Sequence, residues 1–404
     1  MEQHSSEQQH HRGPRSHRPG KHRLEAWLWK DVHRQVIHSI DHPSLVPSEA
    51  SVSSASRCEL VCSYNWAFGQ DEKIHIPVGS AAVFQNISLP VTIPKDRGTF
   101  FVDQNAARVP DFPFAPLFRA TASMNPSFRF DDIDVLVNRN SLRKLLDFSA
   151  GRSQDSFRVN LHLVHRTLVI ERCERTAREL ISGSKNSGWG RNFERKFTTY
   201  PPGLEDSTAH HRALRYQLGD LACVVRFEVD ACYEKTGEGS CSEPLEGAMG
   251  RLAVGDGPGE VAASPKLPTQ PSMAQATAAE IKTAIKPKSP SAYMPQLWFG
   301  RTPWLIIGQH ANGTFEQLKI THVAARFTNW EERHQADLRK LVTVLAHLRQ
   351  AVEEHGGRHC VAIYEKTAKT PEIKVYSSCV VKQAVPDDLR RKLWKSQING
   401  PPTL

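Results

Sequence analysis

Two apolar segments of the chain carry pairs of charged residues two positions apart, and this pattern limits the folds that the chain can adopt. VVRFEVDACY contains Glu228 and Asp230, and AAEIKTAI contains Glu280 and Lys282. In an extended strand, residues at i and i+2 point to the same side. Burying such charges is costly unless they are paired or bind a metal ion. The two segments therefore predict strands whose charged sides meet.

If these strands are neighbours, three carboxylates and one lysine converge on one face. A divalent cation compensates the repulsion between carboxylates, and oxygen-only ligands favour Mg²⁺ or Mn²⁺ over zinc. A lysine beside such a cluster can orient an attacking water or stabilise charge that grows on a phosphate. This is the chemistry of a metal-dependent phosphodiesterase. Alternating charges on one strand are also typical of a solvated face, so each pair alone is a weak signal.

The composition permits a polyanionic partner such as nucleic acid, without requiring one, and gives no sign of a membrane protein. The 404 residues are 39% hydrophobic and 24% charged, as in ordinary globular proteins, with a net charge of +9. The eight cysteines are scattered without zinc-site spacing, which indicates reduced thiols in the nucleus or the cytoplasm. We slightly prefer the nucleus. The absence of long apolar runs predicts a protein that is neither secreted nor inserted in a membrane.

Composition shifts divide the chain into four parts. Residues 1–56 begin with a basic, His-rich stretch that we expect to be a disordered tail, followed by a folded domain over residues 57–390. Residues 234–276 are dense in Gly, Pro and Ser and predict a disordered insertion within that domain. Residues 391–404 are expected to form a C-terminal tail.

Periodicity predicts an α+β class, a single domain around one mixed sheet with flanking helices. FRVNLHLVHRTLVIERCE indicates two strands, LACVVRFEVDACY a buried strand, and HCVAIYEK and EIKVYSSCVV two more. SLRKLLDFSA indicates a short helix. A long amphipathic helix is predicted from Asn329 as its cap to Gly356, with one stripe formed by Leu338, Leu341, Leu345 and Leu348.

Five short motifs occur in an order that is more specific than any one of them. Arg139 lies in DDIDVLVNRNSLRKLLDF, Glu194 in GWGRNFERKF, and Gln296 at the head of PQLWFGRTPWLIIG, around the Glu-x-Asp and Glu-x-Lys pairs. With this set the chain resembles the DXO-type decapping exonuclease family. That family is a branch of the PD-(D/E)XK nuclease superfamily and removes aberrant or non-canonical 5′ ends from RNA. The resemblance covers roughly Asp131 to Leu348.

The resemblance implies a fold of PD-(D/E)XK nuclease type and a role for each matched residue. Lys282 would place the water, and Arg139 and Gln296 would contact the phosphates of an RNA 5′ end. One or two Mg²⁺ or Mn²⁺ ions would be held by Glu194, Glu228, Asp230, Glu280 and the carbonyl of Ile281.

Two features depart from the family pattern. The insertion before Glu280 is longer than the connection usual in the family, and His310 stands where an arginine often follows the strand. The flanking segments CSYNWAFG and GTFFVDQNAARVPDFPFAPLFRA resemble a divergent fungal group of such proteins. Two functions stay open: a metal-dependent hydrolase of RNA 5′ ends, or a scaffold of the same fold that binds RNA or protein with little turnover.

Overall fold

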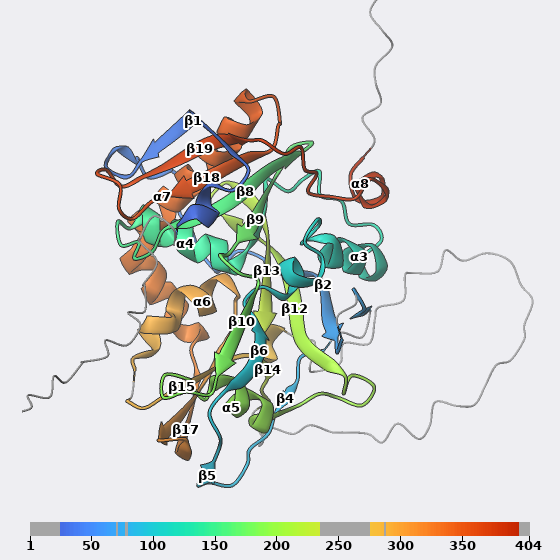
Figure 1. Ribbon diagram of the computed structural model, residues 1–404, viewed down its shortest axis with the longest axis vertical. Coiled ribbons are helices and arrows are strands. Elements are labelled where there is room, and N and C mark those ends of the chain that lie inside the picture. The colour runs from blue at the N-terminus through green and yellow to red at the C-terminus, as the bar shows by residue number, and fades with distance from the viewer. Residues whose placement is uncertain (1–24, 70–71, 77–79, 235–274, 287, 396–404) are drawn as a thin grey trace, which may run out of the picture.

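The computed structural model describes residues 25–69, 72–76, 80–234, 275–286 and 288–395. Helices and mixed sheets combine in these residues, which confirms the predicted α+β class. The strands divide between two large sheets and a two-stranded ribbon, where the sequence predicted one sheet (Figure 1).

The larger sheet has ten strands among the described residues, in the order β1-β19-β18-β8-β9-β7-β13-β12-β2-β3. β7 pairs in parallel with both β9 and β13, and the other pairs in this sheet are antiparallel. The strands are β1 (Val32–Asp41), β2 (Glu59–Ala67), β3 (Ile74–His75), β7 (Val135–Asn138), β8 (Phe157–Val164), β9 (Thr167–Cys173), β12 (Ser207–Leu218), β13 (Leu221–Val229), β18 (Cys360–Tyr364) and β19 (Glu372–Ser378).

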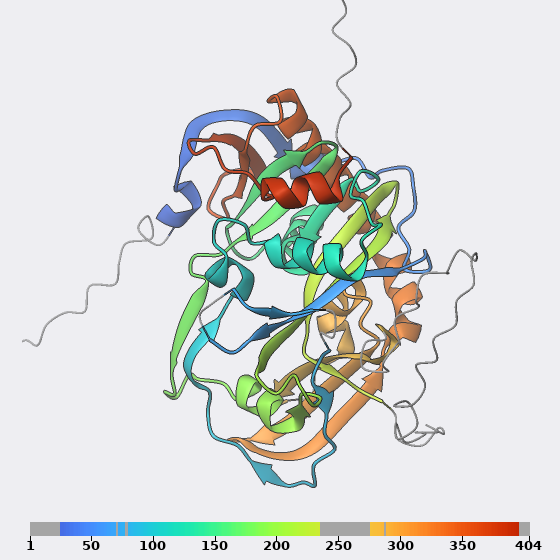
Figure 2. The ribbon, with the colours of Figure 1, turned by 90° about the vertical axis from the view of Figure 1, so that its right-hand side faces the viewer.

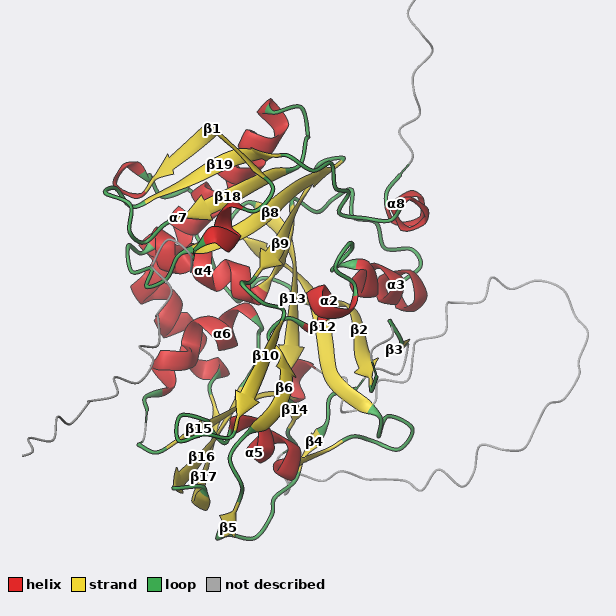
Figure 3. Ribbon diagram, viewed as in Figure 1, coloured by secondary structure: helices red, strands yellow, loops and turns green. Residues whose placement is uncertain are grey.

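Helices cover both faces of this sheet (Figures 2 and 3). Alternate residues of β13 enter different cores: Val225 joins the cluster that includes α4 and α7, whereas Val224 joins the cluster that includes α3 and α8. A strand covered on both faces is apolar over most of its length, which explains the unbroken apolar run LACVV before Arg226. The helices are α2 (Gln104–Arg108), α3 (Ala115–Met124), α4 (Arg139–Ser149), α5 (Gly190–Phe197), α6 (Met294–Phe299), α7 (Phe327–Glu354) and α8 (Asp387–Leu393).

The second sheet has the order β11-β4-β14-β15-β16-β17-β5, and the separate ribbon pairs β10 with β6. The strands are β4 (Val83–Phe84), β5 (Val91–Thr92), β6 (Arg97–Phe101), β10 (Arg178–Ser182), β11 (Thr198–Thr199), β14 (Ala231–Cys232), β15 (Ala278–Ala284), β16 (Trp304–Ala311) and β17 (Thr314–His322). The chain passes from the larger sheet to this one at Asp230, between β13 and β14. That residue therefore stands where the two sheets meet.

The prediction that folding begins at residue 57 is wrong, because β1 lies within the expected tail. β1 pairs with β19 at the edge of the larger sheet, and its Val32 and Ile40 are buried. Val52 also donates its backbone N–H to Gln335 Oε1 of α7 at 2.7 Å. An edge strand that keeps polar side chains toward solvent gives little apolar signal, which is why the sequence concealed it.

The boundary of the predicted C-terminal tail also moves. α8 continues to Leu393, and Trp394 is buried and stacks on Phe130 with ring centroids 4.8 Å apart. The folded part therefore extends past residue 390. Residues 235–274 and 396–404 lie outside the described residues, so the expected disorder of the insertion and of the last residues stays a prediction.

The long helix is confirmed, with its four leucines buried, but it begins at Phe327 and not at an Asn329 cap. A 3₁₀ turn over Ala324–Arg326 leads into it and adds a turn before the predicted start. Gly356, with φ of +71°, follows its end as expected. None of the helices in the described residues is both long and apolar enough to cross a membrane.

Candidate active site

Asp230, Glu280 and Lys282 meet where the two sheets join. β13 and β15 are not paired strands; instead β14, the continuation of β13, pairs with β15 and sets Ala231 opposite Ala279. The backbone N–H of Ile281 donates to Asp230 Oδ2 at 2.8 Å. Lys282 Nζ lies 3.9 Å from Asp230 Oδ2 and forms a closer ion pair with Glu280. The two carboxylates are therefore less than about 8 Å apart, despite about fifty residues between them in sequence.

Glu280 is the most deeply buried carboxylate of this group, with 1% of the residue exposed. Three side chains share it: Lys282, Gln296 through its Nε2, and Arg139, whose Nη1 lies 3.3 Å from Oε2. Arg139 is the first residue of α4, directly after β7. Because β7 runs parallel to β13, the start of α4 after β7 lies next to the carboxyl end of β13.

Gln296 lies in α6, a short helix that precedes β16. MPQLWF forms a helix because Leu297, Trp298 and Phe299 pack into the core, and β16 begins only at Trp304. Trp298 is anchored by an Nε1–H bond to Glu331 Oε1 at 2.7 Å. Gln296 remains half-buried, facing Glu280.

Glu194 reaches the group from α5, which packs against β15. A Cβ at Gly308 of β16 would lie 2.5 Å from the ring of Phe193, so glycine is required there for α5 to lie this close. Buried Asp96 caps the helix, accepting from the backbone N–H groups of Arg191 and Asn192 at 3.2 and 2.9 Å. These contacts fix the position from which the Glu194 carboxyl points toward the carboxylates of the sheets.

The charges in this group do not balance. Burial, and then the charge of Asp230, raise the pKa of Glu194 well above its usual value. Burial followed by the charge of Glu280 raises the pKa of Asp230 to about 8. Burial alone would raise the pKa of Glu280, but the charges of Lys282 and Arg139 outweigh burial and lower this pKa. Crowded carboxylates that resist ionisation indicate a site built for an additional cation.

Glu228 and Lys282 complete the set. Glu228 is exposed at the end of β13, and its pKa is raised by partial desolvation, against the effect of Arg139. Water screens this exposed carboxylate, so its interactions with the neighbouring charges are weaker than those of Glu280. Burial lowers the pKa of Lys282, but Glu280 and Asp230 reverse the direction and raise it. Lys282 is therefore a cation in this arrangement.

The sequence did not single out Arg143, one helical turn after Arg139 on α4. Its Nη1 donates to Gln296 Oε1 at 3.2 Å, so Gln296 bridges Arg143 and Glu280. Burial, and then the nearby charge of Arg139, lower the pKa of Arg143. Two guanidinium groups side by side favour an anion between them. The i, i+4 spacing was a usable signal, since it puts both side chains on one face of the helix.

The chemistry of the donor set fits a hard divalent cation, because four carboxylates lie near enough to raise the pKa of Glu194 and of Asp230, and oxygen ligands suit Mg²⁺ or Mn²⁺. The present side-chain positions do not complete a coordination group. Among the residues that the structure describes, no three His, Cys, Asp or Glu side chains are arranged to hold a metal ion. The Glu280 carboxylate in particular already interacts with the side chains of Lys282, Gln296 and Arg139.

A family model matches residues 34–394, nearly the whole described chain; its description is a domain of unknown function, DUF8563. The chain belongs to the DUF8563 family. No curated protein matches this DUF8563 chain by sequence.

Solved structures show which fold this DUF8563 chain has. Rai1 of S. pombe, in complex with 3′-FADP, is similar with a TM-score of 0.54 and 12% identity, over 84% of this chain and 99% of that one. Rai1 of Candida albicans, in complex with pU5-Mn²⁺, gives 0.53 and 12%, over 88% and 98%. Rai1 of Scheffersomyces stipitis, with (3′-NADP)⁺ and a calcium ion, gives 0.54 and 9%, over 84% and 93%. At these identities the similarity establishes a common fold, and it confirms the resemblance at that level.

Proposed function

We propose that this protein is a metal-dependent hydrolase acting on RNA 5′ ends. The observation that carries the proposal is the convergence of Asp230, Glu280 and Lys282 with Arg139 and Gln296 at the meeting of two sheets. A carboxylate group in excess of its cations, beside basic and amide side chains, suits a phosphate and a metal ion. The fold of Rai1 supports it, since the C. albicans protein was solved with pU5-Mn²⁺.

The metal would be Mg²⁺ or Mn²⁺, held by the carboxylates and by the carbonyl of Ile281. When bound, it would neutralise phosphate charge and lower the pKa of a bound water. Loading would require Glu280 to give up part of its contact with Gln296, Lys282 or Arg139. The residues proposed as ligands are Glu194, Glu228, Asp230, Glu280 and Ile281.

The remaining residues would act on the phosphate. Lys282 is held as a cation against Asp230 and Glu280, so it would orient the water and stabilise developing charge, not abstract a proton. Arg139 and Gln296 would hold the phosphates of the 5′ end. Arg143 would share that role through Gln296.

The decisive experiment measures release of 5′ product from end-labelled RNA by the purified full chain. Triphosphate, unmethylated cap, NAD cap and monophosphate ends are compared, with Mg²⁺, with Mn²⁺ and with chelator. The proposal expects turnover of at least one of these RNAs that chelator abolishes. Absence of product from all of them with either metal contradicts it.

The alternative is a scaffold of the same fold that binds RNA or protein with little turnover. The surroundings of Glu280 favour this scaffold, because the Glu280 carboxylate already interacts with Lys282, Gln296 and Arg139 without a metal ion. A protein that binds RNA in the same experiment without releasing product would be this scaffold. A location in the nucleus or the cytoplasm is compatible with either function and stays a prediction.

A further inference from the structure

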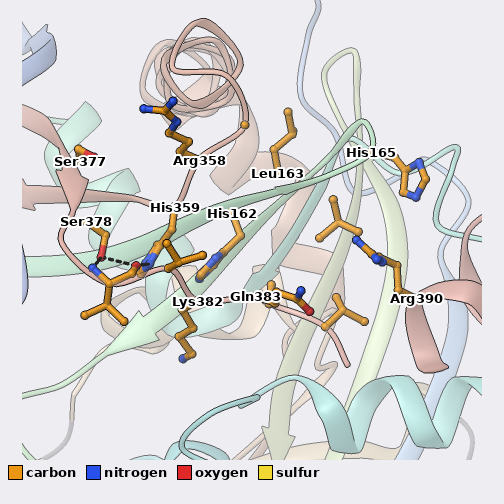
Figure 4. A pocket seen from close by; sticks show the side chains of 16 residues that line it. His162, Leu163, His165, Arg358, His359, Ser377, Ser378, Lys382, Gln383 and Arg390 are labelled. Atoms are coloured by element: carbon orange, nitrogen blue, oxygen red, sulfur yellow. Dashed lines mark hydrogen bonds between the residues drawn. The ribbon is translucent and has the colours of Figure 1, made fainter. Parts of the chain in front are cut away.

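A pocket of about 470 Å³ lies away from the candidate active site (Figure 4). β8, the segment before β18, the end of β19 and the segment that leads into α8 form its walls, and none of the predicted site residues lines it. Val164 pairs with Thr167 at the amino end of β9, whereas β7 and β13, which run parallel, reach the candidate site at their carboxyl ends. The pocket therefore lies at the opposite end of these strands.

The ionisable side chains that line the pocket are all basic. Arg358, Lys382 and Arg390 line it together with three histidines, and no Asp or Glu is among the lining residues. Figure 4 shows His162 and His359 side by side, with Lys382 beside them and Arg390 reaching in from α8; the two imidazole centroids are 4.2 Å apart.

Most of this positive charge is not cancelled nearby. Glu171, behind the lining, is already paired with Lys382 at 3.0 Å and with His162 at 3.4 Å. Arg390 contacts Asp387 at 2.9 Å, but both are about half exposed, where such a pair is weak. Arg358 is exposed and has no ion pair within the described residues. Arg358 and Arg390 are therefore available to an anion.

A smaller pocket of about 260 Å³ extends the basic surface. It shares His165 and Arg390 with the first pocket and adds Arg391 and Lys395, with Trp394 between them. Lys395 is the last residue that the structure describes, so this surface is defined only up to that point. The two pockets together place basic side chains along one side of α8.

We propose that the pocket beside His162 and His359 binds a phosphate ester of nucleotide size. Its volume lies within the ~300–1,000 Å³ usual for small-ligand sites. Arg358 and Arg390 supply the guanidinium groups that recognise phosphate. Val380 and Val381, both exposed, add apolar surface beside the imidazoles, against which a base can pack. The ligand is either a free nucleotide or a nucleotide of an RNA chain, and the site is independent of the candidate active site.

The test is calorimetric titration of the full chain, in chelator, with AMP, with pyrophosphate and with a 5′-hydroxyl oligouridine. Arg358→Ala combined with Arg390→Ala is expected to weaken binding at least about tenfold, because two charge-assisted contacts are lost. Arg333→Ala removes an equally exposed arginine on α7 and is the matched control. AMP binding identifies a free nucleotide as the ligand, whereas binding of the oligouridine alone identifies an RNA segment.

A further variant separates this pocket from the candidate site. Arg143→Gln alters a residue proposed to bind phosphate at the candidate active site. Loss of binding in that variant and not in the double variant places the ligand at the candidate site and overturns the proposal. No binding of any probe overturns it as well. Arg390→Lys keeps the charge and is expected to retain part of the affinity, which distinguishes a lost contact from a misfolded chain.

Discussion

Two carboxylates of this protein are equally buried but have opposite surroundings. Glu171 in β9 and Glu280 in β15 each expose 1% of the residue. Glu171 contacts His162 and Lys382. Burial alone would raise the pKa of Glu171, but these two partners lower it to about 2. Glu280 also has cations beside it, but Asp230 lies within the same ion-pair network.

The difference lies in the balance of charge. At Glu171 a single carboxylate faces the ammonium group of Lys382 and the imidazole of His162, so its burial is compensated, and breaking the arrangement leaves a lysine unpaired. At Glu280 the carboxylates exceed the cations, and the raised pKa values of Asp230 and Glu194 record the repulsion. A fold does not retain such repulsion for stability, so we interpret Glu171 as structural and Glu280 as functional.

The largest expected effect is on turnover. Asp230→Asn and Glu280→Gln should each reduce hydrolysis of 5′-labelled RNA by about a thousandfold or more, since each removes a proposed metal ligand. RNA binding should persist or strengthen, because a negative charge that repels phosphate is gone. Rates and affinities are measured in parallel, with Glu316→Gln, an exposed carboxylate of β17, as the control.

The same variants are informative about stability. Asp230→Asn should leave the free energy of unfolding unchanged or raise it, because it relieves repulsion in the absence of metal. A strongly destabilised Asp230→Asn protein would show that Asp230 is a structural group like Glu171, and the contrast between the two regions would fail.

The second prediction concerns Glu171. Its pKa falls from 4.5 to about 2 on folding, so its pairing adds about 3 kcal/mol of stability at neutral pH. Because the folded value is the lower one, this contribution is present above about pH 4.5 and is lost as the pH falls toward 2. Glu171→Gln should lower the free energy of unfolding by roughly that amount near pH 7 and by less near pH 3, as measured by denaturant titration.

Turnover per folded molecule should not change in Glu171→Gln, because β9 brings no proposed ligand to the site. An unchanged denaturation midpoint at neutral pH would contradict the structural role. A loss of activity without a loss of stability would instead assign Glu171 to the function.

A third, smaller effect is expected at the phosphate-binding side chains. Arg143→Gln and Gln296→Ala should each reduce kcat/KM for 5′-phosphorylated RNA by about 10- to 100-fold, since they position the substrate and do not hold the metal. Arg143→Lys keeps the charge but not the guanidinium, and should fall between wild type and Arg143→Gln. An equal loss on 5′-hydroxyl RNA would indicate a general structural defect and exclude phosphate recognition by Arg143.

The sequence predicted those parts of the fold that local periodicity determines. α4, α7, β8, β9 and β13 follow from residues close in sequence, and the paired charges indicated that Glu228, Asp230, Glu280 and Lys282 belong to one group. The division into two sheets could not be predicted in this way, because it depends on where the chain leaves β13 and on the pairing of β14 with β15.

The missed elements have physical reasons of the same kind. β1 is an edge strand with mostly polar side chains, and α6 is an apolar run too short to show a helical period. The partners of Glu171 are equally invisible in sequence, since Lys382 lies 211 positions away. Arg143 on α4 has the appearance of an ordinary solvent-facing charge until Gln296 and Arg139 are seen beside it.

The smallest effect is expected from the segment between β14 and β15. Tyr233 donates its backbone N–H to the carbonyl of Thr277 at 2.8 Å, so the two ends of this segment are already held together by the described chain. A short linker can therefore span the gap, and loop closure depends only weakly on length, by roughly 0.6 kcal/mol for each halving. Replacing residues 235–274 by a short Gly/Ser linker should leave the melting temperature within a few degrees of wild type, or slightly above it. Thermal unfolding followed by circular dichroism measures this directly.

A cooperative loss of folding in the shortened chain would mean that the segment contributes to the core, and that the junction at Asp230 and Glu280 depends on it. An unchanged melting temperature with unchanged turnover would confine both the fold and the site to the rest of the chain.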